Sequence, residues 1–461
     1  MSIFGSLRNT INTLDVLSQA LDLTQNNIAN VSTPGYARHT LQFIARPFEL
    51  GSLPGGVSAG ELQSTRQDYA ERSVRQQVET LGKMDVSKDL LANLEQVFDI
   101  SGKTGVAAEL SGLFASFSAW SVRPNDVGAR RSVMSSMQQV AQAFNATASA
   151  ISDQAANVER RTQSTLGEIN RLVGVLRDIN VGRRSLTSPD AGMEARLYNT
   201  LEELSRLVNF TASFEEDGTV SLSLAGRYPL LLGDHQTQLS ISYDQPDDAT
   251  YSGGLPPAHL LSGERDLTEM VSGGELAALM SFRNQTVPSL IGGPYALGEL
   301  NQLASTFAGR VNAISTAAGG PALFAYDAAS PVRAAVTLRV APGVTDADLV
   351  AAGSAGNDVA LALAQLSNSQ ASADKIDSLS YTGFFAQMIG RIGSESAEAA
   401  KAADVQEDIL TQSKTLRASV SGVSLDEEAV KLVEYQRSYQ AMARMTNVLN
   451  ELSETILTLL R

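Results

Sequence analysis

Residues 7–36 read LRNTINTLDVLSQALDLTQNNIANVSTPGY, with apolar side chains every three or four positions. A leucine or isoleucine stands at every seventh position, and a further isoleucine fills an intermediate turn: Leu7, Ile11, Leu14, Leu21 and Ile28. Such a heptad stripe on an otherwise polar segment predicts an amphipathic helix. We expect this helix to stop near Asn30, because Pro34 and Gly35 follow it and both interrupt helices.

The other end of the chain has a matching pattern. From residue 425 onward, apolar side chains step by threes and fours with one irregular step: Leu425, Leu432, Tyr435, Tyr439, Met442, Leu449 and Ile456. Ser424 precedes Glu427 and Glu428, which is typical of an N-cap followed by acidic residues in the first turn. Periodicity alone leaves two alternatives open. Each terminal helix packs on its own globular body, or the two pair with each other and with neighbouring copies.

Long helices are predicted between the two ends. The stretch between Pro124 and Pro189 contains no proline, and its apolar residues recur at helical spacing. Most of that span as one helix would be roughly 80 Å long, at 1.5 Å per residue. A helix of that length indicates a rod-like bundle rather than a globule.

The apolar period changes to two in the middle of the chain. Residues 219–224 and 238–243 alternate apolar and polar side chains, and residues 336–340 do so again later. The dipeptide Asp217-Gly218 before the first run is a hairpin signal. The sequence therefore predicts a small β-rich domain inserted, in two pieces, into a helical bundle.

These patterns predict a mainly α fold with an inserted β domain, arranged as an elongated multi-domain rod whose terminal helices pair as a coiled coil. The expected parts are an inner coiled-coil domain of residues 1–40 and 421–461, an elongated helical bundle of residues 41–208, 264–319 and 356–420, and a small β-rich outer domain of residues 209–263 and 320–355. The outer domain is expected at the end opposite the termini.

Composition argues against several classes of protein. The chain has 461 residues, with 50 acidic against 35 basic side chains, so its net charge of -15 repels nucleic acids and anionic lipids. It contains no cysteine, which excludes disulfides, thiolate metal sites and cysteine nucleophiles. No apolar run reaches the roughly 18 residues of a membrane span, and the first residues do not resemble a cleavable signal peptide. We expect neither nucleic-acid binding nor membrane insertion.

The sequence contains few residues that suggest catalysis or metal binding. Residues 56–60 match the G-x-S-x-G pattern of hydrolases, but a loop rather than an apolar strand precedes them, so we expect a loop leading into a strand. The histidines lack metal-ligand spacing and are expected at the surface: His39, His235 and His259. The acids at 426–428 fit the start of a helix. The sequence therefore predicts no catalytic residue, no metal site and no cofactor, and a protein that is not an enzyme.

The segment 28–36 resembles the N-terminal signature of flagellar axial proteins, the group of rod, hook and hook-associated proteins. Its polar residues cap or turn the chain, its proline ends the helix, its glycine permits a reversal and its tyrosine offers a large packing surface. The candidate assembly residues of this signature are Asn30, Thr33, Pro34, Gly35 and Tyr36.

The C-terminal segments 421–429 (SGVSLDEEA) and 435–441 (YQRSYQA) are similar to the end of the family of the first hook-associated protein. Shorter likenesses follow in the same order as in that family, at residues 120–131, 273–284 and 356–361. Together they identify the chain as a member of this family. The stretch 313–320 is shorter than is usual there, and the outer domain is small.

The resemblance implies a structural protein that self-assembles at the hook–filament junction and leaves the cell through the flagellar type III export channel. The implied partners are copies of itself in a ring or helical layer, the flagellar hook protein, the second hook-associated junction protein and a cytoplasmic export chaperone that holds the C-terminal helix. The implied location is the extracellular flagellum, after synthesis in the cytoplasm. An isolated helix pair is marginal in water, so we expect both termini to be mobile in the monomer and to fold on assembly.

Three other assignments compete with this one. Another axial component, such as a hook or distal rod protein, shares the signature but usually lacks the long central helices. An exported adhesin or effector would act through the outer domain. A peptidoglycan-cutting enzyme would need a clustered acid pair in a cleft domain, and the sequence offers none.

Overall fold

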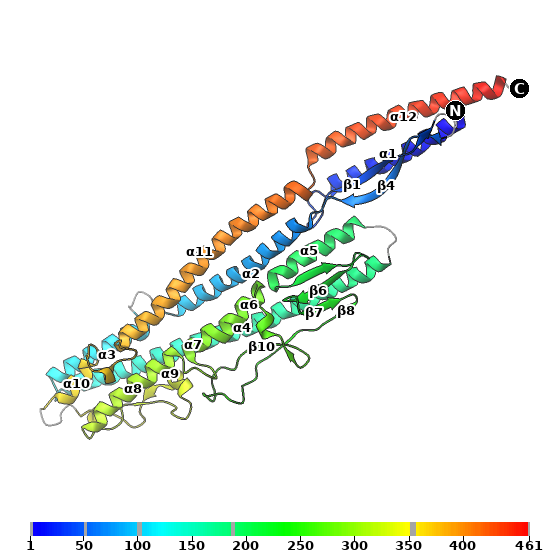
Figure 1. Cartoon of the computed structure of the whole chain (residues 1–461). Coiled ribbons are helices and arrows are strands. Elements are labelled where there is room, and N and C mark those ends of the chain that lie inside the picture. The colour runs from blue at the N-terminus through cyan, green and yellow to red at the C-terminus, as the bar shows by residue number, and fades with distance from the viewer. Residues whose placement is uncertain (1–2, 50–52, 99–103, 186–189, 351–355, 460–461) are drawn as a thin grey trace.

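The protein is an elongated rod with both termini at one end (Figure 1). The computed structural model describes residues 3–49, 53–98, 104–185, 190–350 and 356–459. Its α-helices are α1 (Ile3–Ala29), α2 (Asp68–Val97), α3 (Gly105–Val122), α4 (Val127–Arg184), α5 (Ala191–Leu207), α6 (Gly274–Ser281), α7 (Val287–Ile291), α8 (Glu299–Ala317), α9 (Ala334–Thr337), α10 (Asp358–Gln365), α11 (Tyr381–Ser421) and α12 (Leu425–Leu459).

The strands are short and all pair antiparallel. They are β1 (His39–Ala45), β2 (Phe48–Glu49), β3 (Leu53–Pro54), β4 (Val57–Ser64), β5 (Thr211–Phe214), β6 (Val220–Leu224), β7 (Tyr228–Leu232), β8 (His235–Gln236), β9 (Ser240–Ser242), β10 (His259–Ser262), β11 (Arg265–Asp266), β12 (Phe324–Ala325) and β13 (Arg339–Val340). The sheets run β1-β4, β2-β3, β5-β6-β7-β8, β11-β10-β9 and β12-β13.

The terminal helices pair, as one of the two alternatives predicted. α1 and α12 lie side by side and antiparallel at the end of the rod (Figure 1). α1 stops at Ala29, one residue before the expected end. α12 begins after Ser424, whose hydroxyl accepts a hydrogen bond from the amide of Glu427 at 3.5 Å. The N-cap expectation is therefore confirmed.

The predicted long helix is α4, whose 58 residues span roughly 87 Å. Its first half packs with α3 and α8 in the larger apolar core. Phe307 of α8 forms the centre of that core, with ring centroids 6.1 Å from Phe114, 5.6 Å from Phe324 and 5.4 Å from Tyr381. The second half of α4 packs against α5 and the β5–β8 sheet in a second core. The mainly helical rod with small antiparallel sheets is the expected fold class.

The strands of residues 211–266 lie on the flank of the rod, whereas β1 and β4 lie beside α1 (Figure 1). β6, β7 and β8 run beside the part of α4 nearer the terminal pair, and α3, α8 and α10 form the opposite end (Figure 1). The sheet β12-β13 is separate from the sheets of residues 211–266 and contributes Phe324 to the larger core. The expectation that the strands close the far end of the rod is therefore wrong.

Two local predictions also differ from the structure. The alternating stretch 336–340 is only partly strand, because α9 runs to Thr337 and β13 begins at Arg339. The helical pattern over 274–314 is interrupted after α7, where Gly292 and Gly298 have φ values of +89° and +84°. These values favour glycine, and the two residues mark the end of α7 and the start of α8.

Candidate functional site: the terminal helix pair and its joint to the bundle

The N-terminal helix leaves part of its apolar stripe uncovered. The predicted heptad residues are half-buried: Leu7, Leu14, Leu21 and Ile28. Ile11 is 51% exposed, whereas Val16 and Ala20 are buried in the contact with α12 and the β1–β4 hairpin. The predicted residues therefore flank the intramolecular contact rather than form its centre.

The C-terminal helix is more exposed still. Four predicted residues are half-buried: Leu432, Tyr435, Met442 and Leu449. Three others are exposed: Leu425, Tyr439 and Ile456. Four residues that the prediction did not include add to this apolar surface: Val430, which is 68% exposed, and the exposed Met445, Val448 and Leu452. Among the described side chains of α12, only Glu428 is buried. An apolar surface of this extent at one end of a rod is typical of an association site.

The signature turn follows α1. The amide of Thr33 donates to the carbonyl of Asn30 at 2.9 Å, and the amide of Tyr36 donates to the carbonyl of Thr33 at 3.1 Å. The Thr33 hydroxyl also donates to the Asn30 side-chain oxygen at 3.0 Å. Pro34 is exposed, and the Tyr36 hydroxyl reaches back to Asn27 Oδ1 at 2.9 Å. Consecutive turns held by polar side chains explain these residue types.

Gly35 is the point where this turn meets the bundle. Its φ is +74°, which L side chains rarely adopt. An added Cβ would lie 2.3 Å from the carbonyl oxygen of Ala195 in α5. Two independent reasons, the backbone conformation and the close approach to α5, therefore require glycine here.

Behind the turn lies a buried charged network, which begins with His39, Arg66 and Glu194. His39 is 3% exposed, so the expectation that it lies at the surface is wrong. Its Nε2 lies 3.0 Å from Glu194 Oε2 and its Nδ1 lies 2.9 Å from the carbonyl of Ala37. Each ring nitrogen of His39 therefore faces an oxygen atom, one from the backbone and one from a carboxylate. Arg66 donates to Glu194 Oε1 at 3.0 Å and to the Gly35 carbonyl at 2.6 Å.

The network continues into α2 and α11. Arg66 also pairs with Glu71, whose other oxygen accepts from Arg417 at 3.2 Å. Arg417 donates as well to Glu202 at 2.7 Å, and Lys414 lies 3.2 Å from the same carboxylate. The β1–β4 hairpin, α2, α5 and α11 thus meet in one set of ion pairs.

A second group of polar contacts fixes α12 to α1. The Glu428 side chain is 2% exposed and accepts from Asn27 Nδ2 at 2.9 Å. Arg38 forms ion pairs of 3.1 Å with both Glu427 and Glu428. The amide of Arg38 donates to the Ser421 carbonyl at 3.0 Å, so the start of the hairpin also contacts the end of α11. We refer to this group and the charged network together as the joint.

Burial and charge act in opposite directions on the carboxylates of the joint. Burial alone would raise the pKa of Glu194, but the hydrogen bonds and charges of His39 and Arg66 outweigh it and lower that pKa. The pKa of Glu202 is lowered in the same way, with Arg417 and Lys414 outweighing burial. Burial, with the charges of Glu428 and Glu194, raises the pKa of Tyr36 to about 12. Glu194 and Glu202 are therefore ionised at neutral pH, and the Tyr36 hydroxyl keeps its proton and can donate it in a hydrogen bond.

The sequence indicated only part of this site. It indicated the signature turn and both helices, which the structure brings together. It did not indicate the ionic residues of the joint, which are Arg38, Arg66, Glu71, Glu194, Glu202 and Arg417. They come from separate segments and follow no spacing rule, and no local signal could have found them. The assembly role of the predicted residues stays a prediction.

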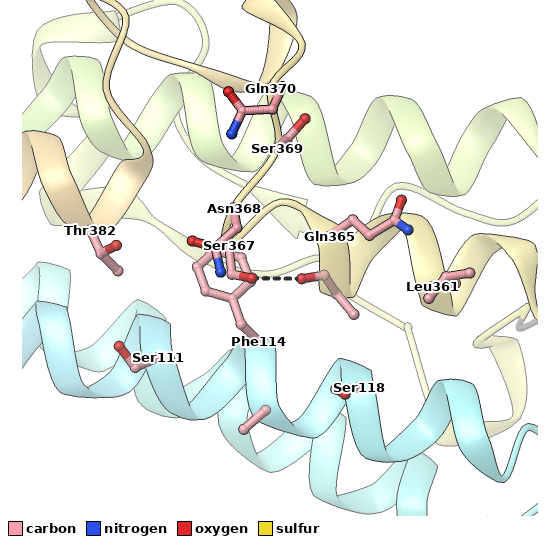
Figure 2. Close-up of a pocket in the computed structure, with 12 residues that line it drawn as sticks. Ser111, Phe114, Ser118, Leu361, Gln365, Ser367, Asn368, Ser369, Gln370 and Thr382 are labelled. Atoms are coloured by element: carbon pink, nitrogen blue, oxygen red, sulfur yellow. Dashed lines mark hydrogen bonds between the residues drawn. The ribbon is translucent and has the colours of Figure 1, made fainter.

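The described residues outside the joint offer little that is suited to catalysis or metal binding. A pocket of about 880 Å³ between α3, α10 and the start of α11 is lined by hydroxyls, amides and apolar groups, including Ser118, Gln365 and Asn368 around Phe114 (Figure 2). None of its lining side chains is a carboxylate, histidine or lysine. Ser58 of the G-x-S-x-G pattern lies within strand β4. In the described part of the chain, no group of acids or histidines is placed to hold a metal ion, and no helix is long and apolar enough to cross a membrane.

Comparison with known proteins agrees with this organisation. Residues 91–319 match the family described as the flagellar hook-associated protein FlgK helical domain. Residues 417–459, which include α12, match the C-terminal family of the flagellar basal body rod FlgEFG proteins.

Individual relatives are distant in sequence. Flagellar hook-associated protein 1 of Bacillus subtilis (strain 168) is 24% identical and aligns over 99% of this chain and 98% of its own length. The proteins of the same name from Salmonella typhimurium and Escherichia coli (strain K12) are each 22% identical, and the alignments span 56% of their length. The solved structure of the flagellar hook junction protein FlgK from Burkholderia pseudomallei has a TM-score of 0.64 and 15% identity, covering 77% of this chain and 100% of that one, and it supports the fold. From the ordered family matches and the end-to-end likeness to the Bacillus protein, this chain belongs to the family of flagellar hook-associated protein 1.

Proposed function

We propose that this protein is a structural subunit of the bacterial flagellum that self-assembles at the hook–filament junction and joins hook to filament. The observation that carries the proposal is the paired helices α1 and α12, which stand at one end of the rod with their apolar stripes partly uncovered. Apolar surface of this kind is buried when helices associate. Family membership supplies the setting in which copies would associate.

The proposed partners follow from the same surface. Copies of the chain would form a ring or helical layer through residues 1–40 and 421–461, and the rest of the molecule would face outward. The hook protein and the second hook-associated junction protein would lie on either side of that layer. Before export through the flagellar type III channel, a cytoplasmic chaperone would cover the apolar side of α12, since helix-in-groove binding suits such a stripe. The working location would be outside the cell.

The joint has a defined part in this proposal. A subunit that transmits force must hold its assembling helices at a fixed angle to its body. Arg66 contacts the signature turn at Gly35 and the bundle at Glu71, so it links both sides of the joint. Buried charges that satisfy one another favour one arrangement, because any other leaves a charge unpaired. The signature turn would therefore set the orientation of the inner helices.

A structural role without catalysis is part of the proposal. The relatives are flagellar hook-associated proteins by name, and the pocket of Figure 2 offers no acid–base pair among its described lining residues. The pKa values of the half-buried carboxylates Glu194 and Glu202 are lowered, and both side chains lie in the joint, where ion pairs account for the shift.

The decisive experiment is genetic. Deleting the gene should leave hooks without filaments under the electron microscope, with flagellin lost to the medium. The full chain supplied from a plasmid should restore filaments, whereas a chain ending at Ser424, which lacks α12, should not. Normal filaments in the deletion strain would overturn the proposal and favour an exported adhesin or effector. Absence of hooks would point to a rod or hook component.

Assembly should also change the order of the termini. We expect α1 and α12 to be mobile in the isolated protein and to gain order on assembly, because a lone helix pair with an uncovered stripe is marginal in water. Circular dichroism of monomer and polymer at equal protein concentration measures this directly. Helicity that stays constant on polymerisation would contradict it.

A further inference from the structure

We propose that neighbouring copies associate through charged lines on the outer faces of the terminal helices, with α1 of one copy antiparallel to α12 of the next. This inference rests on the proposed self-assembly and adds which helices meet, in which direction and in which register.

The charges of α1 form a line. The helix has three charged residues, Arg8, Asp15 and Asp22, and each is seven residues from the next. Residues seven apart recur on nearly the same face of a helix. All three are exposed and lie on the face away from the buried Val16 and Ala20.

α12 carries a matching line on its own exposed face. Arg437, Arg444 and Glu451 are also spaced by seven, and all three are exposed. The half-buried residues that contact α1, such as Met442 and Leu449, lie on the other side of the helix.

The two lines do not meet within one chain. None of their six residues forms an ion pair with any described residue, although Asp15 accepts a hydrogen bond from Gln19 at 3.0 Å. The reason is geometric, because each line is on the face of its helix that points away from the partner helix. Two complementary lines on opposite sides of a helix pair are suited to a contact between copies.

When the two lines overlap over all three positions, only one arrangement makes every pair attractive. In the antiparallel arrangement of α1 with α12, Arg8 faces Glu451, Asp15 faces Arg444 and Asp22 faces Arg437. A parallel arrangement of the same helices would place Arg8 against Arg437 and Asp22 against Glu451, which are like charges. Two α1 lines placed antiparallel would put Asp15 against its copy, and two α12 lines would do the same with Arg444. Like charges in such positions disfavour the wrong partner and register.

The register is close to the one within the chain. The Asn27–Glu428 contact fixes the intramolecular alignment of α1 and α12. Counting along both helices from that contact, Arg8 lies at the level of Asn447, four residues from Glu451. The intermolecular alignment therefore differs by about one helical turn, or roughly 6 Å along the axis.

Apolar surface lies beside the charged lines. Val430, Met445, Val448 and Leu452 of α12 are exposed, as is Ile11 of α1. The contact uses a different face on each copy, so it is heterologous and repeats in one direction. Contacts of this kind generate closed rings or helical layers.

The first test is a charge swap in the full chain, expressed in the deletion strain. Asp15→Arg or Arg444→Asp alone should reduce filaments per hook roughly five-fold, because attraction becomes repulsion at every contact. The double variant should return to within two-fold of the wild type. Glu407→Arg, at an exposed position on α11, is the matched control and should have no effect. The amount of each variant secreted into the medium checks that export is intact.

The second test is cross-linking, for which the absence of native cysteine is convenient. The pair Asp15→Cys and Arg444→Cys should give a ladder of disulfide-linked dimers and larger species from assembled protein under mild oxidation. The pair Asp22→Cys and Arg444→Cys, displaced by two helical turns, should give few disulfide-linked species. A disulfide between positions 15 and 444 can form only between copies, since these positions face away from each other within one chain.

The outcomes separate this inference from the proposed function. One outcome is that the wild-type gene restores filaments, the double charge-swap variant forms no more filaments than the single variants, and the cysteine pair gives no ladder. The charged lines are then not the contact between copies, and the junction role stands. The other outcome is that the deletion strain forms normal filaments without the gene, which overturns the proposed function. Cross-linking of the purified protein then decides whether the contact between copies exists.

Discussion

Replacing Arg66 by methionine should loosen the joint while leaving the bundle intact. The Arg66 side chain is 6% exposed, and its partners Glu71 and Glu194 are 3% and 16% exposed. Removing one member of a buried ion pair costs about 3–5 kcal/mol, because it leaves an uncompensated charge. Here Arg417 still faces Glu71 and His39 still faces Glu194, so we expect the lower limit. About 3 kcal/mol corresponds to a roughly 100-fold shift toward the open joint.

Amide hydrogen exchange of the full chain measures this opening. Two backbone hydrogen bonds cross the joint, from the amide of Arg38 to Ser421 at 3.0 Å and from the amide of Thr65 to Arg38 at 2.8 Å. Both amides should exchange roughly 100-fold faster in Arg66→Met. Amides in the middle of α4, around Ile151, should be unchanged because they lie in the bundle core.

The control is Arg72→Met on α2, six residues further along the chain. Arg72 pairs with Asp68 at 2.9 Å, but the two side chains are 67% and 57% exposed. Such surface pairs contribute about 0.2–1 kcal/mol at most, so exchange at the joint should change little. Indistinguishable exchange in the two variants would refute the argument that burial gives the Arg66 pairs their importance. Adding Glu71→Gln and Glu194→Gln to Arg66→Met should recover part of the loss, since the two carboxylates that Arg66 neutralises are then uncharged.

Three further predictions concern other parts of the structure. Gly35→Ala should lower the free energy of unfolding in urea by about 2–3 kcal/mol, because the φ of Gly35 is +74° and the added Cβ meets the α5 backbone. The control is Gly309→Ala in α8, where a Cβ meets nothing within 4 Å, and it should be neutral or stabilising by up to about 1 kcal/mol. The joint should open in acid, because the pKa values of Glu194 and Glu202 are lowered in the folded state. The stabilisation from these two carboxylates is complete above the unfolded-chain pKa of about 4.3 and is lost as the pH falls below it. Amide exchange at the joint that stays unchanged between pH 6 and pH 3, after correction for intrinsic rates, would contradict this. Phe307→Ala should lower the free energy of unfolding by about 3–5 kcal/mol in urea titration, and a loss under about 1 kcal/mol would be incompatible with its place in the aromatic core.

Helix ends were predictable where residues with restricted backbones mark them. Pro34 and Gly35 stop α1 within one residue of the expected position, and Ser424 caps α12. The length of α4 followed from a long stretch without proline. These features depend on local sterics and on hydrogen bonds within a few residues, which the sequence states directly.

The strand prediction failed where two periods compete. Residues 336–340 alternate apolar and polar side chains, yet α9 starts at the buried residues Ala334 and Ala335 and runs to Thr337. Packing of these small residues in the larger core outweighs the β preference of a short segment. For this reason a short apolar run alone does not distinguish a strand from a helix.

The joint could not be predicted because its residues are brought together only by the complete fold. Arg66 and Glu194 are 128 positions apart, and Arg417 and Glu71 are 346 apart. His39 looked like a surface residue, because nothing near it in the sequence announces the carboxylate of Glu194. Long-range ion pairs carry no periodic signal, so neither the pattern of charges nor their spacing reveals them.

The composition of the joint has a mechanical consequence. Two chain segments cross from the terminal helices and their β1–β4 hairpin to the bundle, at residues 65–67 and 421–424, and the signature turn contacts α5 beside them (Figure 1). In the described part of the chain, none of the three apolar clusters includes a residue of α1 or α12. Apolar contacts tolerate sliding, whereas hydrogen bonds weaken steeply with angle and distance. Under bending or torsional load the joint should therefore behave as a stiff coupling with a set angle, which resists small deflections and yields abruptly once its ion pairs separate.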